Sequence, residues 1–240
     1  MTMKKSDHNL QLGLGESIYD SSSEVSAQVA AGQHRAVVGS LWEELGDLQI
    51  KFLISQGLRP SHTLLDVGCG CLRLGVKAIP YLQRGNYFGI DNNASLLEAG
   101  MNVELQQIDL KEALPEERLF ILPDFEFDKL EKKFDYLIAQ SLFSHFTLNR
   151  IRRCLSRMIP LLHETSKIFA TFFEVPAGQD PEKPLRHDAG GIISYSDKDP
   201  YHYRFSDLEF IAQGLPLKIR YLGEWGHPRN QKMVLFELRK

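Results

Sequence analysis

Apolar residues along the chain recur in two patterns, first at helical steps and then in short continuous runs. Between about Val25 and Gly57 the helical steps are made by Val37, Leu41, Leu45, Leu48, Phe52 and Leu53. This spacing gathers the apolar side chains on one helical face, so we expect helices before the first strand. Gly57 is expected to end this helical region.

From residue 63 onward, short apolar runs alternate with stretches of helical period, which is typical of a mostly parallel sheet with helices on both faces. No helix fits between the last two runs, so we expect those strands to pair antiparallel. The fold class is therefore α/β, a doubly wound seven-stranded mixed sheet with an antiparallel last strand and an N-terminal helical extension. The predicted strands are Thr63–Asp66, Tyr87–Asp91, Leu119–Leu122, Tyr136–Gln140, Ile168–Phe173, Leu217–Leu222 and Lys232–Leu238.

The helices predicted among these strands are Leu72–Leu82, Ala94–Gln106, Leu148–Leu162 and Ser206–Gly214. Ser206 precedes Glu209 by three residues, which indicates a capping box with Ser206 as the N-cap. The third helix is amphipathic, and its polar side carries Arg150, Arg152, Arg153 and Arg157. A charge run on a helix is usually a solvated face, and we prefer that interpretation to an anion site.

Two segments break the rhythm of strands and helices. Residues 1–26 mix Gly, Ser and Asp with little periodicity, so we expect a loose arm there. We divide the chain into an N-terminal arm and helical cover over residues 1–57 and one α/β domain over residues 58–240. The long excursion from Val175 to His202 is rich in Pro, Gly, Asp and Lys, and loops of this length are usually lids or mobile segments.

Composition narrows the class of protein. The chain has 240 residues and a formal net charge of −3, with no global bias toward nucleic acid or a membrane surface. No apolar run approaches the roughly 20 residues of a membrane span, so we expect a cytoplasmic protein with no membrane partner. The three cysteines are expected to be reduced. Cys69 and Cys71 lack two further ligands at metal spacing, so we expect no metal site.

The strongest chemical signal follows the first predicted strand, where Asp66-Val67-Gly68-Cys69-Gly70 places two glycines directly after an acid. Glycine adopts positive φ and carries no side chain, so this turn can hold a ligand against main-chain N–H groups. About twenty residues later a second apolar run ends in Asp91. An acid at this strand tip is where doubly wound folds hold the ribose hydroxyls of a nucleoside cofactor.

With these residues in place, the chain resembles class I S-adenosylmethionine-dependent methyltransferases over roughly Leu41 to Lys240. The resemblance is carried by the glycine turn, by Asp91, by a fourth strand reading Phe134-Asp135-Tyr136-Leu137-Ile138-Ala139-Gln140-Ser141, and by a terminal strand pair without a helix. It implies S-adenosyl-L-methionine as the cofactor and methyl transfer to a small-molecule oxygen or nitrogen. A nucleic-acid methyltransferase is a further alternative, but the acidic balance and the absence of a basic patch interleaved with aromatic residues count against it, so we expect no nucleic-acid partner.

The resemblance assigns cofactor roles residue by residue. Asp91, followed by Asn92, would accept hydrogen bonds from the ribose, unless Asp91 only caps the next helix. Gly68, Cys69 and Gly70 would hold the cofactor by their backbone. Asp66 would either meet the cofactor amino group or order the glycine loop alone.

Asp124 and Phe125 resemble the acidic and aromatic pair at the adenine ring, the alternative being a surface acid beside a core Phe. A third glycine of the family pattern is replaced by Leu72, and Arg73 is either exposed or available to the cofactor carboxylate. After the fourth strand, Gln140 and Ser141 are candidates for cofactor contacts.

Two histidines are candidate bases for a hydroxyl acceptor because the unperturbed pKa of histidine lies near neutral pH. His145 follows the fourth strand, and its alternative role is to cap the following helix. His202 ends the long excursion, where it either lines the acceptor pocket or packs a lid onto the sheet. The turn from Gly223 to Met233 also either faces the acceptor or holds the lid.

Two other functions compete with methyl transfer. An NAD-dependent oxidoreductase shares the same motif logic, but its fingerprint needs a third glycine where this chain has Arg73. A protein that binds S-adenosylmethionine without methyl transfer fits the same cofactor residues. The sequence leaves the acceptor, the methylated atom and the oligomeric state open.

Overall fold

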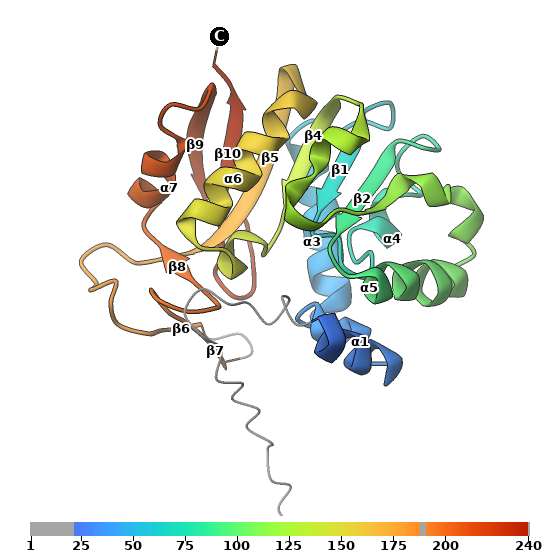
Figure 1. Ribbon diagram of the computed structural model, residues 1–240, viewed down its shortest axis with the longest axis horizontal. Coiled ribbons are helices and arrows are strands. Elements are labelled where there is room, and N and C mark those ends of the chain that lie inside the picture. The colour runs from blue at the N-terminus through green and yellow to red at the C-terminus, as the bar shows by residue number, and fades with distance from the viewer. Residues whose placement is uncertain (1–21, 188–190, 240) are drawn as a thin grey trace, which may run out of the picture.

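A computed structural model of the protein describes residues 22–187 and 191–239 (Figure 1). Residues 1–21 of the predicted loose arm lie outside the described residues, and the remainder of that arm is helical because α1 begins at Ser22. The helices are α1 (Ser22–Ala30), α2 (His34–Val37), α3 (Trp42–Ser55), α4 (Gly75–Ala78), α5 (Ala94–Ala99), α6 (Leu148–Met158) and α7 (Phe205–Ala212).

The strands form one large sheet and a small hairpin. They are β1 (Leu64–Val67), β2 (Tyr87–Asp91), β3 (Leu119–Ile121), β4 (Phe134–Ala139), β5 (Leu162–Glu174), β6 (Leu185–His187), β7 (Ile192–Ser194), β8 (His202–Tyr203), β9 (Leu217–Gly223) and β10 (Lys232–Leu238). Among the described residues the large sheet has eight strands, in the order β3-β2-β1-β4-β5-β10-β9 with β8 beside β5. The strands β1 to β5 run parallel, and β10 is antiparallel to both β5 and β9. The predicted mixed sheet is thus confirmed. It has one strand more than the seven predicted, which is β8.

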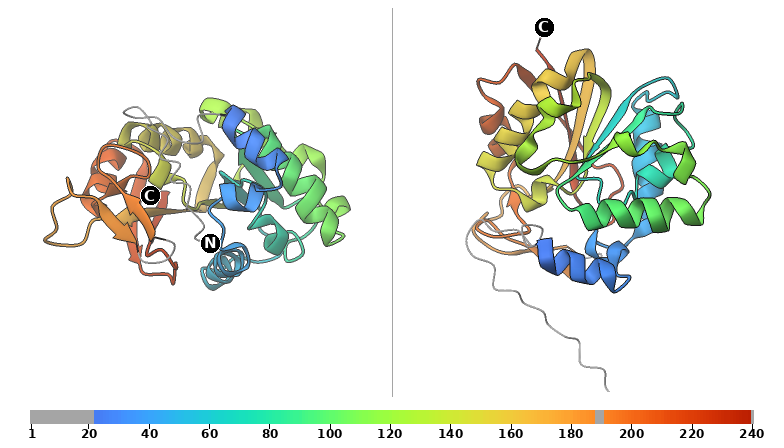
Figure 2. Two further views of the ribbon diagram at one scale, coloured as in Figure 1. Left: turned by 90° about the horizontal axis from the view of Figure 1, so that it is seen from below. Right: turned by 45° about the vertical axis from the view of Figure 1, so that its right-hand side comes forward.

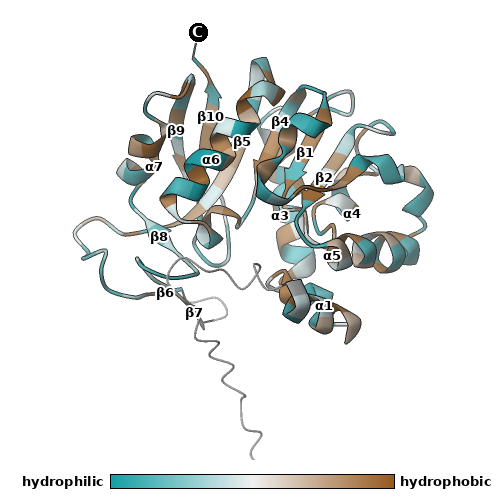
Figure 3. Cartoon of the chain, viewed as in Figure 1, coloured by the Kyte–Doolittle hydropathy of each residue, from teal (hydrophilic) through white to brown (hydrophobic). Residues whose placement is uncertain are grey.

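Both faces of the sheet are covered, because side chains alternate along each strand. Leu65 points into a core with α6 and α7, whereas its neighbour Leu64 points into a second core with α3 and α4. Figure 3 shows hydrophobic colour along the central strands and hydrophilic colour on the outer side of α6. None of the helices in the described part of the chain is long and apolar enough to cross a membrane.

The helix predicted over Leu72–Leu82 is much shorter than expected. Leu72 has φ of +69°, which a right-handed helix cannot contain, and Pro80 follows the last residues of the turn. Only Gly75–Ala78 remains helical. By contrast, the helix predicted over Ala94–Gln106 is present as α5 followed by a π-helical stretch at Gly100–Leu105.

The N-terminal helices belong to the same body as the sheet. Phe52 of α3 packs edge-on against Phe169 of β5, with ring centroids 5.1 Å apart. Gly57 follows this helix with φ of +98° and ends it. In Figure 2, α1 lies beside α5, where the Ser26 hydroxyl donates to the Ser95 hydroxyl at 3.2 Å.

The long excursion is more ordered than a plain loop. It contains the β6–β7 hairpin and ends in β8, which extends the sheet beside the end of β5. The helix after it, α7, has its N-cap two residues earlier than predicted. Its N-cap is Arg204, whose backbone N–H donates to the Asp207 carboxylate at 2.8 Å, so Ser206 lies inside the helix.

Candidate active site

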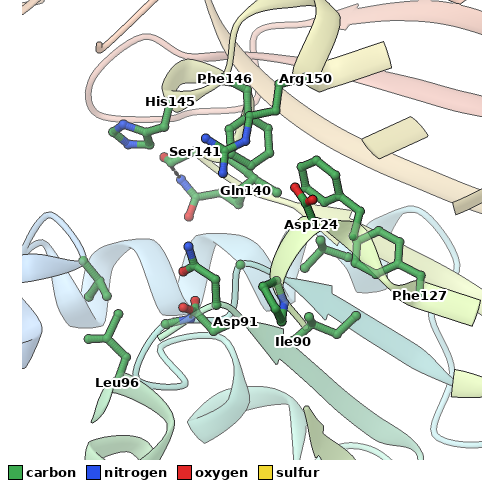
Figure 4. A pocket seen from close by; sticks show the side chains of 18 of the residues that line it. Ile90, Asp91, Leu96, Asp124, Phe127, Gln140, Ser141, His145, Phe146 and Arg150 are labelled. Carbon is green, nitrogen blue, oxygen red and sulfur yellow. Dashed lines mark hydrogen bonds between the residues drawn. The ribbon is translucent and has the colours of Figure 1, made fainter. Parts of the chain in front are cut away.

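A cavity of about 300 Å³ opens at the carboxyl ends of the parallel strands (Figure 4). Each of four neighbouring strands delivers a wall residue just after or at its last position: Gly68 after β1, Asp91 on β2, Asp124 after β3 and Gln140 after β4. The carboxyl ends of parallel strands meet at one edge of a sheet, where open α/β folds bind their ligands. The motifs predicted from the sequence therefore converge here.

The structure brings together most of the site residues predicted from the sequence. His145 lines the cavity, whereas His202 does not. Asp66 and Cys69 line a smaller cavity that shares Gly68, Gly70, Arg73 and Gln140 with the first. The predicted cofactor residues that line the larger cavity are Gly68, Gly70, Arg73, Asp91, Asn92, Asp124, Phe125, Gln140 and Ser141.

The glycine turn is built by the backbone. The N–H groups of Gly68 and Cys69 both donate to the carbonyl of Ile90, at 2.8 and 2.9 Å, which ties the turn to the next strand. Gly70 has φ of +54°, and a Cβ there would lie 2.6 Å from Cγ1 of Val38. Glycine is required at this position because the segment after α2 packs directly onto the turn.

Leu72 occupies the place of the family's third glycine and keeps the conformation that a glycine would adopt, with φ of +69°. Its side chain is fully buried. Space for that side chain comes from two glycines, since a Cβ on Gly75 or Gly100 would approach Leu72 to 2.9 or 2.7 Å. The departure from the family pattern is thus compensated by glycines on neighbouring turns.

Asp91 joins the two strand ends through its carboxylate. One oxygen accepts from the Gly70 N–H and the other from the Asn93 N–H, each at 2.9 Å. Burial raises the pKa of Asp91, against the opposing effect of these backbone donors. Asn93, not Asp91, caps α5, because its side chain accepts from the backbone of Ser95 and Leu96. The capping alternative for Asp91 is therefore wrong.

Asp66 is almost fully buried and accepts a hydrogen bond of 2.8 Å from the Tyr87 hydroxyl. Burial raises the pKa of Asp66 to about 7, while the Tyr87 hydrogen bond and the charge of Arg73 act in the opposite direction. A cationic ligand group beside Asp66 would stabilise the ionised carboxylate and so lower the pKa of Asp66.

Arg73 connects the glycine turn to two other segments. Its guanidinium donates to the carbonyls of Val38 and Ser40, at 2.8 and 3.2 Å, and to Oε1 of Gln140 at 2.7 Å. The same Gln140 oxygen accepts from the Gln49 amide of α3 at 3.2 Å. Arg73 is buried, so the interpretation of an exposed side chain is wrong.

The turn after β4 is held by the neighbouring strand β5 and by the turn before β10. Ser141 has φ of +57°, and its N–H donates to the Thr171 hydroxyl at 2.7 Å. Oε1 of Gln231 accepts from both hydroxyls, at 3.0 Å from Ser141 and 2.6 Å from Thr171. The turn before β10 therefore supports the Gln140-Ser141 backbone.

The wall opposite the glycine turn is aromatic. Phe125 is buried with φ of +60°, and its ring packs edge-on against Phe127 and Phe146. The Arg150 guanidinium lies 4.5 Å from the centre of the Phe146 ring. Asp124 lines the cavity beside Phe125 with an exposed side chain.

The predicted solvated face of α6 is only partly solvated. Arg150 lines the cavity. Arg152 donates to the carbonyls of Ile211 and Gln213 at the end of α7. Arg153 forms an ion pair of 3.5 Å with Asp124. Charge pattern alone could not separate these roles, because all three side chains lie on the polar side of one helix.

His145 and His202 differ in their surroundings. Nδ1 of His145 lies 2.5 Å from Oδ1 of Asp199, and Thr147 caps α6, so the capping alternative for His145 is wrong. His202 is buried, with one ring nitrogen 3.0 Å from the Ser194 hydroxyl and the other 2.8 Å from the Pro181 carbonyl. Its hydrogen bonds hold the excursion together.

Several wall and support residues carry no signal in the local sequence. Val38 reaches the cavity from the N-terminal cover, and Asp199 reaches His145 from the excursion. Both are far from the motifs along the chain, so only tertiary contacts reveal them. In the described residues, no cluster of three or more His, Cys, Asp or Glu side chains is placed to hold a metal ion.

Comparison with known proteins locates the fold. No family model matches the sequence. An S-adenosylmethionine-dependent methyltransferase from Clostridium acetobutylicum superposes with a TM-score of 0.62 at 12% identity, covering 89% of this chain and 99% of that one. The magnesium protoporphyrin IX methyltransferase of Synechocystis, solved with bound SAM, gives 0.57 at 14% identity, covering 82% and 79%.

A third solved structure differs in its acceptor. The chain is similar to a putative rRNA-methylase from Clostridium thermocellum, with a TM-score of 0.55 at 11% identity, covering 80% of this chain and 94% of that one. The three names all describe methyl transfer, but they do not share one acceptor. The structural similarity therefore does not indicate the acceptor class of this chain. The sheet order and these superpositions agree that the chain has the fold of the class I S-adenosylmethionine-dependent methyltransferases.

Proposed function

We propose that the protein binds S-adenosyl-L-methionine and transfers its methyl group to an oxygen or nitrogen of a small molecule. The observation that carries the proposal is the convergence of four strand ends on one cavity, with the glycine turn, Asp91, the Asp124-Phe125 pair and Gln140 all in its walls. We assign residues 58–240 to a methyltransferase domain and residues 1–57 to an N-terminal cover, whose described part contributes Val38 to the cavity wall.

The amino-acid end of the cofactor would point toward the smaller cavity, beside the glycine turn. That cavity holds one acid, Asp66, and one base, Arg73, among its walls. A zwitterion needs one partner of each charge, so the ammonium would face Asp66 and the carboxylate would face Arg73.

The nucleoside end fits the larger cavity. Asp91 at the tip of β2 has the lone pairs to accept from ribose hydroxyls in addition to its two backbone donors, since each carboxylate oxygen accepts more than one bond. Phe125 offers a ring face to a purine, and Asp124 offers a carboxylate to an exocyclic amine.

When bound, S-adenosylmethionine supplies a methyl group on a positively charged sulfur, which makes the carbon open to in-line attack. The chain's own contribution is alignment. Gln140 and Ser141 are fixed by Arg73, Thr171 and Gln231, so the wall facing the acceptor is rigid before binding. Holding two reactants in line can supply roughly 7–11 kcal/mol of barrier reduction without a dedicated catalytic side chain.

An NAD-dependent oxidoreductase is a weaker candidate on the topology of the sheet. Such enzymes use six strands in the order 3-2-1-4-5-6 with a glycine-rich turn that has a third glycine. Here β10 is inserted antiparallel between β5 and β9, and the third-glycine position of that fingerprint is the buried Arg73.

The test is isothermal titration calorimetry with S-adenosylmethionine, S-adenosylhomocysteine and NAD. We expect binding of the first two and none of NAD. Asp91→Ala should weaken S-adenosylmethionine binding at least tenfold, because a bond to a charged partner contributes about 1.5–3 kcal/mol. Binding of NAD alone would refute the proposal.

The matched control is Asp135→Ala. Asp135 also accepts from a backbone N–H, that of Thr63 at 2.8 Å, but it lies outside both cavities. Its substitution should leave S-adenosylmethionine affinity unchanged. Cofactor binding with no methyl transfer to any acceptor would favour the alternative of a non-catalytic binding protein.

A further inference from the structure

We infer that His145 is the general base for a hydroxyl acceptor and that Asp199 is its positioning residue, so that the enzyme methylates oxygen. This inference rests on the proposed methyl transfer and names its acceptor class. Two observations carry it. His145 lines the cavity beside the Gln140-Ser141 turn (Figure 4). Its ring is held by the buried carboxylate of Asp199, which comes from a distant segment.

The hydrogen bond to Asp199 selects one tautomer of His145. A carboxylate only accepts, so at 2.5 Å from Oδ1 it is Nδ1 of the ring that carries the hydrogen. In the neutral ring, Nε2 then holds the lone pair and is the nitrogen able to take a proton. The same arrangement of carboxylate, imidazole and attacking hydroxyl orients the base in other acyl- and group-transfer enzymes.

Asp199 is well fixed. Only 1% of its side chain is exposed. The excursion that carries it is tied to the segment around His145, because the Tyr201 N–H donates to the Ser144 carbonyl at 2.6 Å and the Tyr203 hydroxyl to the Phe146 carbonyl at 2.5 Å. The excursion therefore acts as a support for the ring of His145.

Other ionisable groups surround this pair. Arg150 of α6 lines the same cavity as His145, as do Asp91 and Asp124 on the opposite walls. Burial is the main cause that raises the pKa of the Tyr203 phenol, and the charge of Asp199 contributes to this rise. The Asp199 carboxylate is in direct contact with Nδ1 of the His145 ring, and this contact favours the tautomer with hydrogen on Nδ1.

The chemical step needs no further reactant. The acceptor oxygen forms the new O–C bond as the S–C bond of the sulfonium breaks, and the S–C electron pair stays on sulfur. The hydroxyl proton moves to Nε2 of His145, and the resulting imidazolium is stabilised by the Asp199 carboxylate. The proton then returns to solvent. General bases of this kind typically contribute 10²–10⁴-fold in rate.

The first experiment measures the tautomer directly, on the full chain without cofactor. The ¹⁵N chemical shifts of the His145 ring should show hydrogen on Nδ1 and a lone pair on Nε2. Asp199→Asn offers an amide that can donate, so it should shift the ring toward the opposite tautomer. Hydrogen on Nε2 in the parent protein, or an unchanged spectrum in Asp199→Asn, would overturn the inference.

A second experiment measures turnover with a panel of small phenols, alcohols and amines, with S-adenosylhomocysteine formation as the readout. For a hydroxyl acceptor, His145→Gln should lower kcat about 100-fold or more at pH 7. The loss should shrink as the pH approaches the acceptor's own ionisation, which a merely structural role would not produce. Equal turnover of an amine by the parent, His145→Gln and Asp199→Asn would contradict the assignment to oxygen.

The matched control is His163→Gln. Nε2 of His163 also pairs with a carboxylate, at 3.2 Å from Asp135, but lies outside both cavities. It should leave turnover unchanged. Calorimetry with S-adenosylmethionine distinguishes failure of the proposed function from failure of the general-base assignment. No binding of S-adenosylmethionine to the parent protein would reject the proposed function. Normal binding with hydrogen on Nε2 of His145 would reject only the assignment of His145 as the general base.

Discussion

The two walls of the cavity are built in different ways. The wall that we propose for the cofactor, here called the cofactor wall, contains Gly70 and Asp91, which are 21 residues apart and belong to one strand-turn-strand unit. The wall that we propose for the acceptor, around Ser141 and His145, is called the acceptor wall. On the acceptor wall, Ser141 is held by Thr171 and Gln231, 30 and 90 residues away, and His145 by Asp199, 54 residues away. The cofactor wall is thus formed by residues close together in the sequence, whereas the acceptor wall forms only when distant segments pack together.

This difference has an energetic side. The cofactor wall depends on backbone conformations that only certain residues adopt, such as the positive φ of Gly68 and Gly70. The acceptor wall depends on buried hydrogen bonds between side chains, each of which contributes about 0.5–1.5 kcal/mol. Substitutions in the first wall should therefore cost more per residue than substitutions in the second.

The largest effect is expected from Gly70→Ala. A Cβ would lie 2.6 Å from Cγ1 of Val38, on a residue with φ of +54°. Left-handed backbone costs about 1–2 kcal/mol in an L-residue, and overpacking adds about 1–3 kcal/mol. We expect a loss of about 3 kcal/mol in the free energy of unfolding, measured by urea denaturation, and weaker binding of S-adenosylmethionine by calorimetry.

Gly178→Ala is the control for Gly70→Ala. Gly178 has φ of +82° but nothing within 4 Å of its missing Cβ, so this variant carries the backbone cost alone. Adding Val38→Ala to Gly70→Ala should recover the part due to the clash. Equal losses in Gly70→Ala and Gly178→Ala would show that packing by the N-terminal cover does not constrain the glycine turn.

Arg73→Met tests the side chain that joins the two walls. It removes the guanidinium bonds to the Val38 carbonyl and to Gln140. Bonds with a charged donor contribute about 1.5–3 kcal/mol, so binding of S-adenosylmethionine should weaken by about tenfold to a hundredfold. Lys77→Met is the control, because Lys77 pairs with Glu43 on the surface, where ion pairs contribute little. Unchanged affinity in Arg73→Met would remove Arg73 from the cofactor site.

The contrast between the walls also explains what could be predicted from the sequence. The succession of strands along the chain and the antiparallel pairing of the last two strands were predictable, because hydrophobic period and missing helices are local signals. The order of the strands within the sheet was not predicted. The convergence of Gly68, Asp91 and Gln140 was predictable for the same reason, since strand ends meet at one edge of a parallel sheet.

Other features were out of reach of local patterns. The short α4 depends on the positive φ of Leu72, which is possible only because Gly75 and Gly100 leave space for its side chain. Asp199 lies in an excursion that reads as a polar loop, and nothing in its neighbours along the chain indicates His145 as its partner. Local patterns describe the residue that is held; only tertiary contacts describe what holds it.

The acceptor wall should show its own pH dependence through His227. Burial lowers the pKa of His227 to about 3, with further contributions from Arg229, Arg73 and His187. Its Nδ1 accepts from the Arg229 N–H, so protonation would place the second ring hydrogen on Nδ1, against that donor.

The unfolded state therefore binds one more proton than the folded state between pH 6.5 and about 3, and stability falls as the pH falls below 6.5. At pH 5 this group should cost about 2 kcal/mol, at 1.36 kcal/mol per pH unit. His227→Gln should remove that part of the difference between urea unfolding at pH 7 and pH 5. His163→Gln, which changes a half-exposed ring, is the comparison, and an equal effect in both variants would contradict a buried neutral His227.

The smallest effect is expected from Thr171→Val, which tests the distant support of the acceptor wall with little change of shape. The Thr171 hydroxyl accepts from the Ser141 N–H at 2.7 Å and donates to Gln231 at 2.6 Å, and the residue is fully buried. Its removal should cost about 1 kcal/mol in urea denaturation. Thr165→Val is the control, because the Thr165 hydroxyl contacts the partly exposed His163 ring, at 3.1 Å from Nδ1.

Thr171→Val should also separate the two walls in binding and turnover. Because Thr171 contacts the Ser141 turn and not the glycine turn, S-adenosylmethionine affinity should fall less than in Arg73→Met, while turnover falls with the loosened Ser141 backbone. A loss of affinity as large as that of Arg73→Met would mean that the two walls are not separable and that the cofactor site also depends on the long-range contacts.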